Sequence, residues 1–182
     1  LFLGFEIMSI SVYILSAFNR KSVRSTEAGI KYLILGGFSS AILLYGIALL
    51  YGASGSVYLT EIVSKFDPTN PLFLAGSALV LIGLIFKIGA FPLHQWVPDV
   101  YEGAPMPVTA FMSVGVKAAA FAILLRVIFE GFVEIQLSIM TVLWIVAVFT
   151  MIVGNIAVIA HKSIKRMLAY STISHARYPL LG

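Results

Sequence analysis

Three ionisable side chains lie in long apolar stretches, where a charge is costly: Glu6, Lys87 and Lys117. A charge at the centre of a bilayer costs about 3 kcal/mol on insertion scales, and such residues usually face a protein interior and serve transport. Their types therefore predict the transfer of protons. A packing ion pair is the alternative, and it would leave one of the two lysines without a partner.

The depth of these residues indicates a direction for the transfer. At about 1.5 Å per helical residue, we place Glu6, Lys87, Lys117 and His175 roughly 14 to 20 Å from the cytoplasmic ends of their spans. The hydrocarbon core is about 30 Å thick, so all four are expected near mid-membrane. His175 ends a polar patch in an apolar stretch and is predicted to act as a relay. Titratable groups at one depth would carry protons along the membrane plane.

Pro92 follows Lys87 by five residues within one apolar stretch. Proline removes a backbone donor and clashes with the preceding turn, so this segment predicts an interrupted helix. Broken helices at mid-membrane commonly mark ion sites, although a simple kink is the alternative. His94 follows the break. Its imidazole titrates near neutral pH, which makes it a candidate relay, or else it forms hydrogen bonds at the membrane interface.

The elements that position these residues are predicted to be transmembrane helices. The sequence is 60% hydrophobic and 11% charged, against about 45–50% and about 25% in soluble domains. Spanning backbone must satisfy its hydrogen bonds internally, and no run shows the period-two alternation of a membrane barrel. We predict an all-α polytopic bundle, with a short surface helix within 54–70. Six apolar runs approach the length of about 20 residues that crosses a bilayer: 1–17, 29–52, 71–97, 104–127, 135–160 and one from about 167.

Charge in the connecting loops predicts the orientation. Loops 18–28 and 161–166 lie on the same side of the membrane by parity and are rich in lysine and arginine. Loops 53–70 and 128–134 contain Lys65 as their only lysine or arginine. Positive charge favours the cytoplasmic side, so we expect the first two loops there. The chain opens on Leu rather than Met and has no signal-peptide pattern, and we take residues 1–182 as a single transmembrane domain and an internal fragment of a longer chain.

Side chains near the predicted cytoplasmic surface have simpler expected roles. Trp96 and Tyr101 flank the third apolar run, and amphipathic rings favour the lipid–water interface. His161 borders a basic loop and is expected to be solvated. The sequence has no cysteine, no P-loop, no Rossmann fingerprint and no nucleophile elbow. We therefore expect no cofactor and no metal in this chain, and no nucleic-acid partner.

Residues 86–111 read FKIGAFPLHQWVPDVYEGAPMPVTAF. This segment closely resembles the signature of the antiporter-like subunits of proton-pumping NADH:quinone oxidoreductase, respiratory complex I. The resemblance is strongest to subunit N, because 94–100 read HQWVPDV where subunits L and M typically read HTWLPDA. Segments 2–13, 26–46 and 164–176 fit the same family, so the resemblance covers nearly the whole chain.

The resemblance implies a fourteen-helix fold with two inverted five-helix repeats, of which this chain looks like helices five to ten. The family pairs the glutamate matching Glu6 with the broken-helix lysine matching Lys87. The lysine matching Lys117 continues the relay toward a lysine beyond this sequence, and Lys165 and His175 match further polar positions.

By that resemblance, the chain is expected to be a proton-translocating subunit of NADH:quinone oxidoreductase, driven by quinone reduction elsewhere in the complex. Its expected partners are other membrane-arm subunits, the lipid bilayer and protons. Its expected location is the bacterial plasma membrane, or the inner mitochondrial or thylakoid membrane in homologues. A Na⁺/H⁺ antiporter subunit and a structural spacer are the alternatives. The sequence departs from the family at Arg177 and Pro179.

Overall fold

The computed structural model describes residues 1–161 and 163–175, with backbone alone at positions 134 and 175. This part of the chain is helical and contains no strand. The elements, in order, are α1 (Phe2–Ser16), α2 (Val23–Ser54), α3 (Leu59–Ser64), α4 (Pro71–Ile88), α5 (Trp96–Gly103), α6 (Met106–Phe111), the π-helical η1 (Met112–Val116), α7 (Lys117–Arg126), the π-helical η2 (Val127–Gly131), the 3₁₀ turn η3 (Val133–Ile135), α8 (Gln136–Ala160) and α9 (Ile164–His175).

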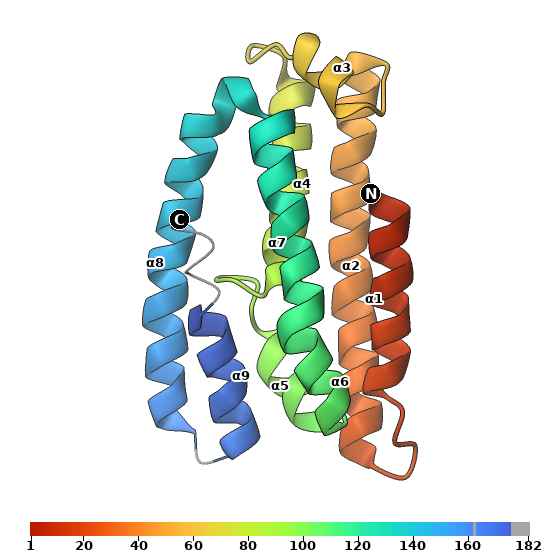
Figure 1. Cartoon of the computed structure of the whole chain (residues 1–182), viewed down its shortest axis with the longest axis vertical. Coiled ribbons are helices and arrows are strands. Elements are labelled where there is room, and N and C mark those ends of the chain that lie inside the picture. The colour runs from red at the N-terminus through yellow and green to blue at the C-terminus, as the bar shows by residue number, and fades with distance from the viewer. Residues whose placement is uncertain (162, 176–182) are drawn as a thin grey trace.

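The helices form an elongated bundle (Figure 1), with α1 and α2 on one side, α4 and α7 in the middle, and α8 and α9 on the other side. Four helical stretches in the described part are long and apolar enough to cross a membrane: Val23–Ser54, Pro71–Ile88, Met106–Gly131 and Gln136–Ala160. The shorter α1 is also apolar. The predicted all-α membrane bundle is confirmed, whereas the count of six spans stays a prediction.

The two ends of the bundle separate the loops as parity predicted. The α1–α2 turn, α5 and the α8–α9 connection lie at one end, and α3 lies at the other (Figure 1). The predicted cytoplasmic loops therefore share an end. The second helix begins earlier than expected, because Ser22 caps it by accepting a hydrogen bond from Ser25 N. Arg24 thus belongs to the first turn of α2 and not to a loop.

Glycines bring α2 and α4 into close backbone contact. A Cβ added to Gly46 would lie 2.9 Å from Gly76 O, and one added to Gly83 would lie 2.7 Å from Leu43 Cβ. Small residues allow membrane helices to approach closely, which favours van der Waals packing. This contact fixes α2 against α4 and so positions the polar residues of α2 near the end of α4.

The predicted helix interruption is confirmed, but it begins three residues before Pro92. Helix α4 ends at Ile88, and Gly89 follows with a left-handed φ of 75°. Gly89 N donates to the carbonyls of Ile85 and Phe86, 3.1 and 2.9 Å away. A glycine at this position pays no Cβ penalty, so glycine ends the helix, and Pro92 lies within the non-helical segment that follows.

The interface positions expected for Trp96 and Tyr101 are wrong. These side chains are 3% and 2% exposed and belong to an aromatic core that includes Tyr32 and Phe86. Trp96 stacks on Tyr32 at 4.5 Å between ring centroids and donates Nε1–H to Phe86 O at 3.0 Å. Helix α5 packs against both α2 and α9, so its aromatic face is enclosed by protein and not by lipid headgroups.

Candidate functional site

Lys87 lies one residue before the end of α4, and its side chain is 2% exposed. Its Nζ lies 3.0 Å from Ser9 Oγ, 3.0 Å from Tyr13 Oη, 3.1 Å from Ser40 Oγ and 3.4 Å from Glu6 Oε1. An ammonium group has three N–H donors. The site therefore places four oxygen atoms around one buried lysine that has only three N–H donors.

Three of these oxygens come from one face of α1. Glu6, Ser9 and Tyr13 are spaced i, i+3 and i+7, which a helix places on one side, and α2 supplies Ser40. Glu6 was predicted from the sequence as a functional residue, whereas the three hydroxyls were not. The spacing of Ser9 and Tyr13 from Glu6 indicates that they share one face of a helix, so they could have been predicted. For Ser40 no signal within its own helix distinguished it from Ser39 beside it.

The predicted contact between Glu6 and Lys87 is present, at 3.4 Å, with Glu6 17% exposed. Ser40 donates its hydroxyl to Glu6 Oε1 at 2.8 Å and accepts from Lys87, so it bridges the pair. The rings of Phe5 and Tyr13 lie 5.3 and 5.6 Å from Lys87 Nζ, a distance at which an aromatic face attracts a cation. The carboxylate and the two aromatic faces attract a cation, whereas the hydroxyls can also donate. A relay role for the pair stays a prediction.

Lys117 begins α7, directly after the π-helical segment Met112–Val116, and is 6% exposed. Its Nζ donates to Thr172 O in α9 at 2.9 Å. No carboxylate of the described residues forms an ion pair with it. Lys117 is therefore the lysine without a charged partner that a single buried ion pair was expected to leave. Single π turns inside helices are frequent at functional sites.

His94 lies in the segment between α4 and α5 and is half-buried. Its Nδ1 has no hydrogen-bond partner among the described residues. The same segment is attached to α8, because Phe91 N donates to Thr150 Oγ1 at 3.0 Å. His94 is thus held inside the broken segment predicted to carry the ion site, and its role stays a prediction.

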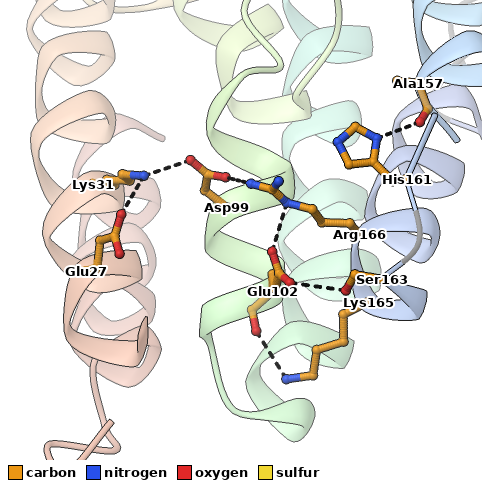
Figure 2. Close-up of polar contacts among 9 residues, drawn as sticks. All are labelled: Glu27, Lys31, Asp99, Glu102, Ala157, His161, Ser163, Lys165 and Arg166. Atoms are coloured by element: carbon orange, nitrogen blue, oxygen red, sulfur yellow. Dashed lines mark hydrogen bonds and ion pairs between the residues drawn. The ribbon is translucent and has the colours of Figure 1, made fainter. Parts of the chain in front are cut away.

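Lys165 lies apart from the two buried lysines, at the end of the bundle that contains α5. Its Nζ donates to the backbone carbonyl of Glu102 at 3.3 Å (Figure 2). It also donates to the carbonyl of Ala104 at 3.4 Å. It therefore belongs to a charged cluster at this end and has no contact with Lys87 or Lys117 in the described part of the chain.

The remaining sequence predictions concern histidines and the end of α9. His175 is the last helical residue described, and its side chain, like Arg177 and Pro179, lies outside the described residues. His161 is not fully solvated as expected: it is half-buried, and its Nδ1 lies 2.8 Å from Ala157 O. Among the described residues, no group of three histidine, cysteine or acidic side chains could hold a metal ion.

The chain matches one family of membrane proteins along its whole length. The model of the NADH:quinone oxidoreductase/Mrp antiporter transmembrane family matches residues 1–182. The chain is 51% identical to NADH-quinone oxidoreductase subunit N of Trichlorobacter lovleyi, over all of this chain and 38% of the relative. It is 50% identical to the subunit N of Myxococcus xanthus, over all of this chain and 36% of that relative. The chain thus spans less than two fifths of the length of these relatives.

Solved structures share the fold over nearly the whole chain. Respiratory complex I from Thermus thermophilus with bound aureothin contains a chain with a TM-score of 0.81 and 40% identity, over 97% of this chain and 38% of that one. The Mrp complex from Dietzia sp. DQ12-45-1b contains one with a TM-score of 0.88 and 27% identity, over 99% and 34%. The archaeal membrane-bound sulfane sulfur reductase contains one with a TM-score of 0.87 and 33% identity, over 99% and 37%.

Proposed function

Because the chain belongs to the NADH:quinone oxidoreductase/Mrp antiporter transmembrane family, we propose that it conducts protons through Lys87 and Lys117 within a membrane complex. The observation that carries this proposal is the buried lysine of α4, held by one carboxylate and three hydroxyls. The relatives are NADH-quinone oxidoreductase subunits, so we assign the driving reaction to quinone reduction elsewhere in the complex. We expect no redox cofactor in this chain.

The hydroxyls around Lys87 suit both protonation states of the lysine. Serine and tyrosine hydroxyls donate one hydrogen bond and accept others, and their hydrogens rotate. Ser9 and Tyr13 can accept from a charged ammonium and can donate to the lone pair of a neutral amine. The site therefore keeps its hydrogen bonds while the lysine gains or loses a proton, which a purely carboxylate environment does not allow.

Lys87 and Lys117 differ in what supports their charge. Lys87 has a carboxylate, three hydroxyls and two aromatic faces, whereas Lys117 has one backbone carbonyl. Burial disfavours a charge that lacks a partner. A proton is therefore stored at Lys87 and reaches Lys117 when the support at Lys87 weakens. His94, Lys165 and His175 remain candidates for further steps.

The proposed function is tested by Lys87→Met in the assembled complex, with proton translocation measured per quinone reduced. Removing the proton carrier should lower this ratio by about a hundredfold, the usual scale of a lost acid–base group. Unchanged translocation would favour the structural spacer.

A Na⁺/H⁺ antiporter subunit remains the second candidate, because the Mrp complex shares this fold. The two candidates differ in their counter-ion. Translocation by the wild-type protein in sodium-free buffer supports quinone-driven proton transfer, whereas a strict requirement for sodium supports the antiporter.

Gly36→Ala is expected to lower proton translocation by about tenfold, although the residue touches no proton carrier directly. A Cβ at this position would clash with Tyr13 Oη, so the ring must move and its hydrogen bond to Lys87 is lost. A hydrogen bond to a charged group is worth about 1.5 kcal/mol or more, or about tenfold in rate.

The matched control is Gly37→Ala, one residue later in the same helix, where a Cβ would meet nothing within 4 Å. Both changes raise helix propensity equally, so they differ in the clash alone. Equal activity of the two variants would show that the Tyr13 hydroxyl does not serve Lys87.

A further inference from the structure

A charged cluster joins α5 and α9 at the end of the bundle that contains the α8–α9 connection (Figure 2). Arg166 of α9 donates Nη2–H to Asp99 of α5. Its Nε lies 2.8 Å from Glu102 Oε2, an ion pair in which the N–H direction does not meet hydrogen-bond geometry. Ser163 donates to Glu102 Oε1 at 3.1 Å. One guanidinium thus bridges two carboxylates that lie on a different helix.

The cluster extends to α2. Lys31 lies 2.8 Å from Asp99 Oδ2 and 2.8 Å from Glu27 Oε1. Burial opposes the ionisation of Asp99, but hydrogen bonds from Lys31 and Arg166 outweigh it and lower its pKa. Asp99 therefore stays charged across the neutral range and ties α2, α5 and α9 together.

Each of the two helices that Arg166 joins also reaches one buried lysine. Trp96, the first residue of α5, donates to Phe86 O, the carbonyl one residue before Lys87. Thr172 of α9 accepts from Lys117. One chain of contacts from Lys87 to Lys117 therefore runs along α5, across the ion pairs of Arg166, and along α9.

We propose that Arg166 is a positioning residue that couples the two lysines, because its bridge to Asp99 and Glu102 holds the carbonyl of Thr172 against Lys117 when α5 moves with Lys87. This inference rests on the proposed relay. It assigns to the cluster a role in transmission, whereas Arg166 itself carries no proton.

The strength of the bridge comes from the network and not from any single contact. Its three side chains are 26 to 34% exposed, and isolated pairs of this exposure contribute little. A guanidinium shared between two carboxylates forms a stronger network than an isolated pair. Its planar fork of N–H groups matches the geometry of carboxylates, whereas the ammonium group of lysine does not. Partial exposure also means that salt screens the bridge, since the Debye length falls to about 3 Å at 1 M.

The test uses Arg166→Gln in the assembled complex, with protons translocated per quinone reduced. We expect a loss of about three- to tenfold, within the usual range for residues that modulate coupling. Arg166→Lys should recover part of it, because lysine reaches one carboxylate and not both. High salt should lower the wild-type ratio more than that of Arg166→Gln, because the variant has already lost the ion pairs of Arg166 and keeps only that of Lys31 with Asp99.

Arg126→Gln is the matched control, because Arg126 pairs with Glu130 at 2.8 Å within one helical stretch and joins no two helices. Wild-type coupling in Arg166→Gln, or an equal loss in Arg126→Gln, would overturn the proposal. Poor assembly of Arg166→Gln with normal pumping by the complex that does assemble would also overturn it.

If Arg166→Gln does not assemble at all, Glu102→Gln is measured instead, because it removes one of the two carboxylates that Arg166 bridges. We expect an intermediate loss of coupling, and wild-type coupling in Glu102→Gln would overturn the proposal. Lys117→Met is measured alongside. If Lys117→Met pumps normally, the proposed relay itself is wrong. If Lys117→Met loses pumping while Arg166→Gln pumps normally, only the role of Arg166 is wrong.

Discussion

Lys117→Met should lower proton translocation by about a hundredfold while the amount of assembled complex stays close to that of the wild type. Loss of an acid–base group from a proton path has effects of this size. Methionine has similar length and is apolar, so it suits a helix position whose neighbours along the helix, Val116, Ala120 and Phe121, are buried. The measurement is protons translocated per quinone reduced, corrected for the amount of complex.

The structural cost of this change is small for a buried lysine. Lys117 makes a single hydrogen bond, to Thr172 O, and has no ion pair among the described residues. Its removal leaves one carbonyl with one acceptor site unfilled, a cost of about 1 kcal/mol. No opposite charge is stranded, in contrast to the loss of a paired residue, which costs about 3 kcal/mol or more.

Lys65→Met is the matched control, because Lys65 also donates to one backbone carbonyl, Ser54 O at 2.7 Å. Lys65 directly follows α3, at the end of the bundle opposite to α5 (Figure 1). Normal translocation by Lys65→Met with loss in Lys117→Met would support the relay. Similar mild effects in both would mean that Lys117 is a packing residue.

The helices and the main ion pair could be predicted from sequence for simple physical reasons. The apolar runs are long enough to cross a bilayer, and their limits agree with the start of α4 and with both ends of α8 to within a residue. The pairing of Glu6 with Lys87 was implied by the resemblance to the family, and their opposite charges and similar estimated depth agree with it.

Other features depended on packing that no single segment contains. Ser40 approaches Lys87 because the glycine contact between α2 and α4 sets their spacing. The π-helical turn before Lys117 has no composition that marks it, since Met112–Val116 is an ordinary apolar sequence. Trp96 was placed at the lipid interface by a rule for lipid-facing rings, and that rule does not apply to a ring enclosed by neighbouring helices.

A double-mutant cycle on Glu6 and Lys87 should give strongly non-additive losses of proton translocation. We expect Glu6→Gln to lower translocation by about tenfold and Lys87→Met by about a hundredfold. If the residues act as a unit, the double variant should match Lys87→Met alone. Independent residues would instead multiply their effects to about a thousandfold, because separate contributions to a barrier add.

The expected non-additivity follows from how the pair is held. A nearby carboxylate favours the charged form of a lysine and desolvation disfavours it, so Glu6 and burial act on Lys87 in opposite directions. We therefore expect that moving or neutralising the carboxylate releases the proton toward Lys117. Without the lysine there is no proton for Glu6 to control, and Glu6→Gln in that background changes nothing further.

Ser40→Ala separates direct from bridged coupling within this pair. The serine lies 2.8 Å from Glu6 Oε1 and 3.1 Å from Lys87 Nζ, whereas the two charged groups are 3.4 Å apart. Removing the hydroxyl leaves the direct ion pair, so the cycle repeated in this background should retain a smaller interaction. Disappearance of the interaction would assign the whole coupling to the serine bridge. Additive losses already in the wild-type background would mean that Glu6 and Lys87 do not communicate, and the control of proton release would then lie elsewhere in the complex.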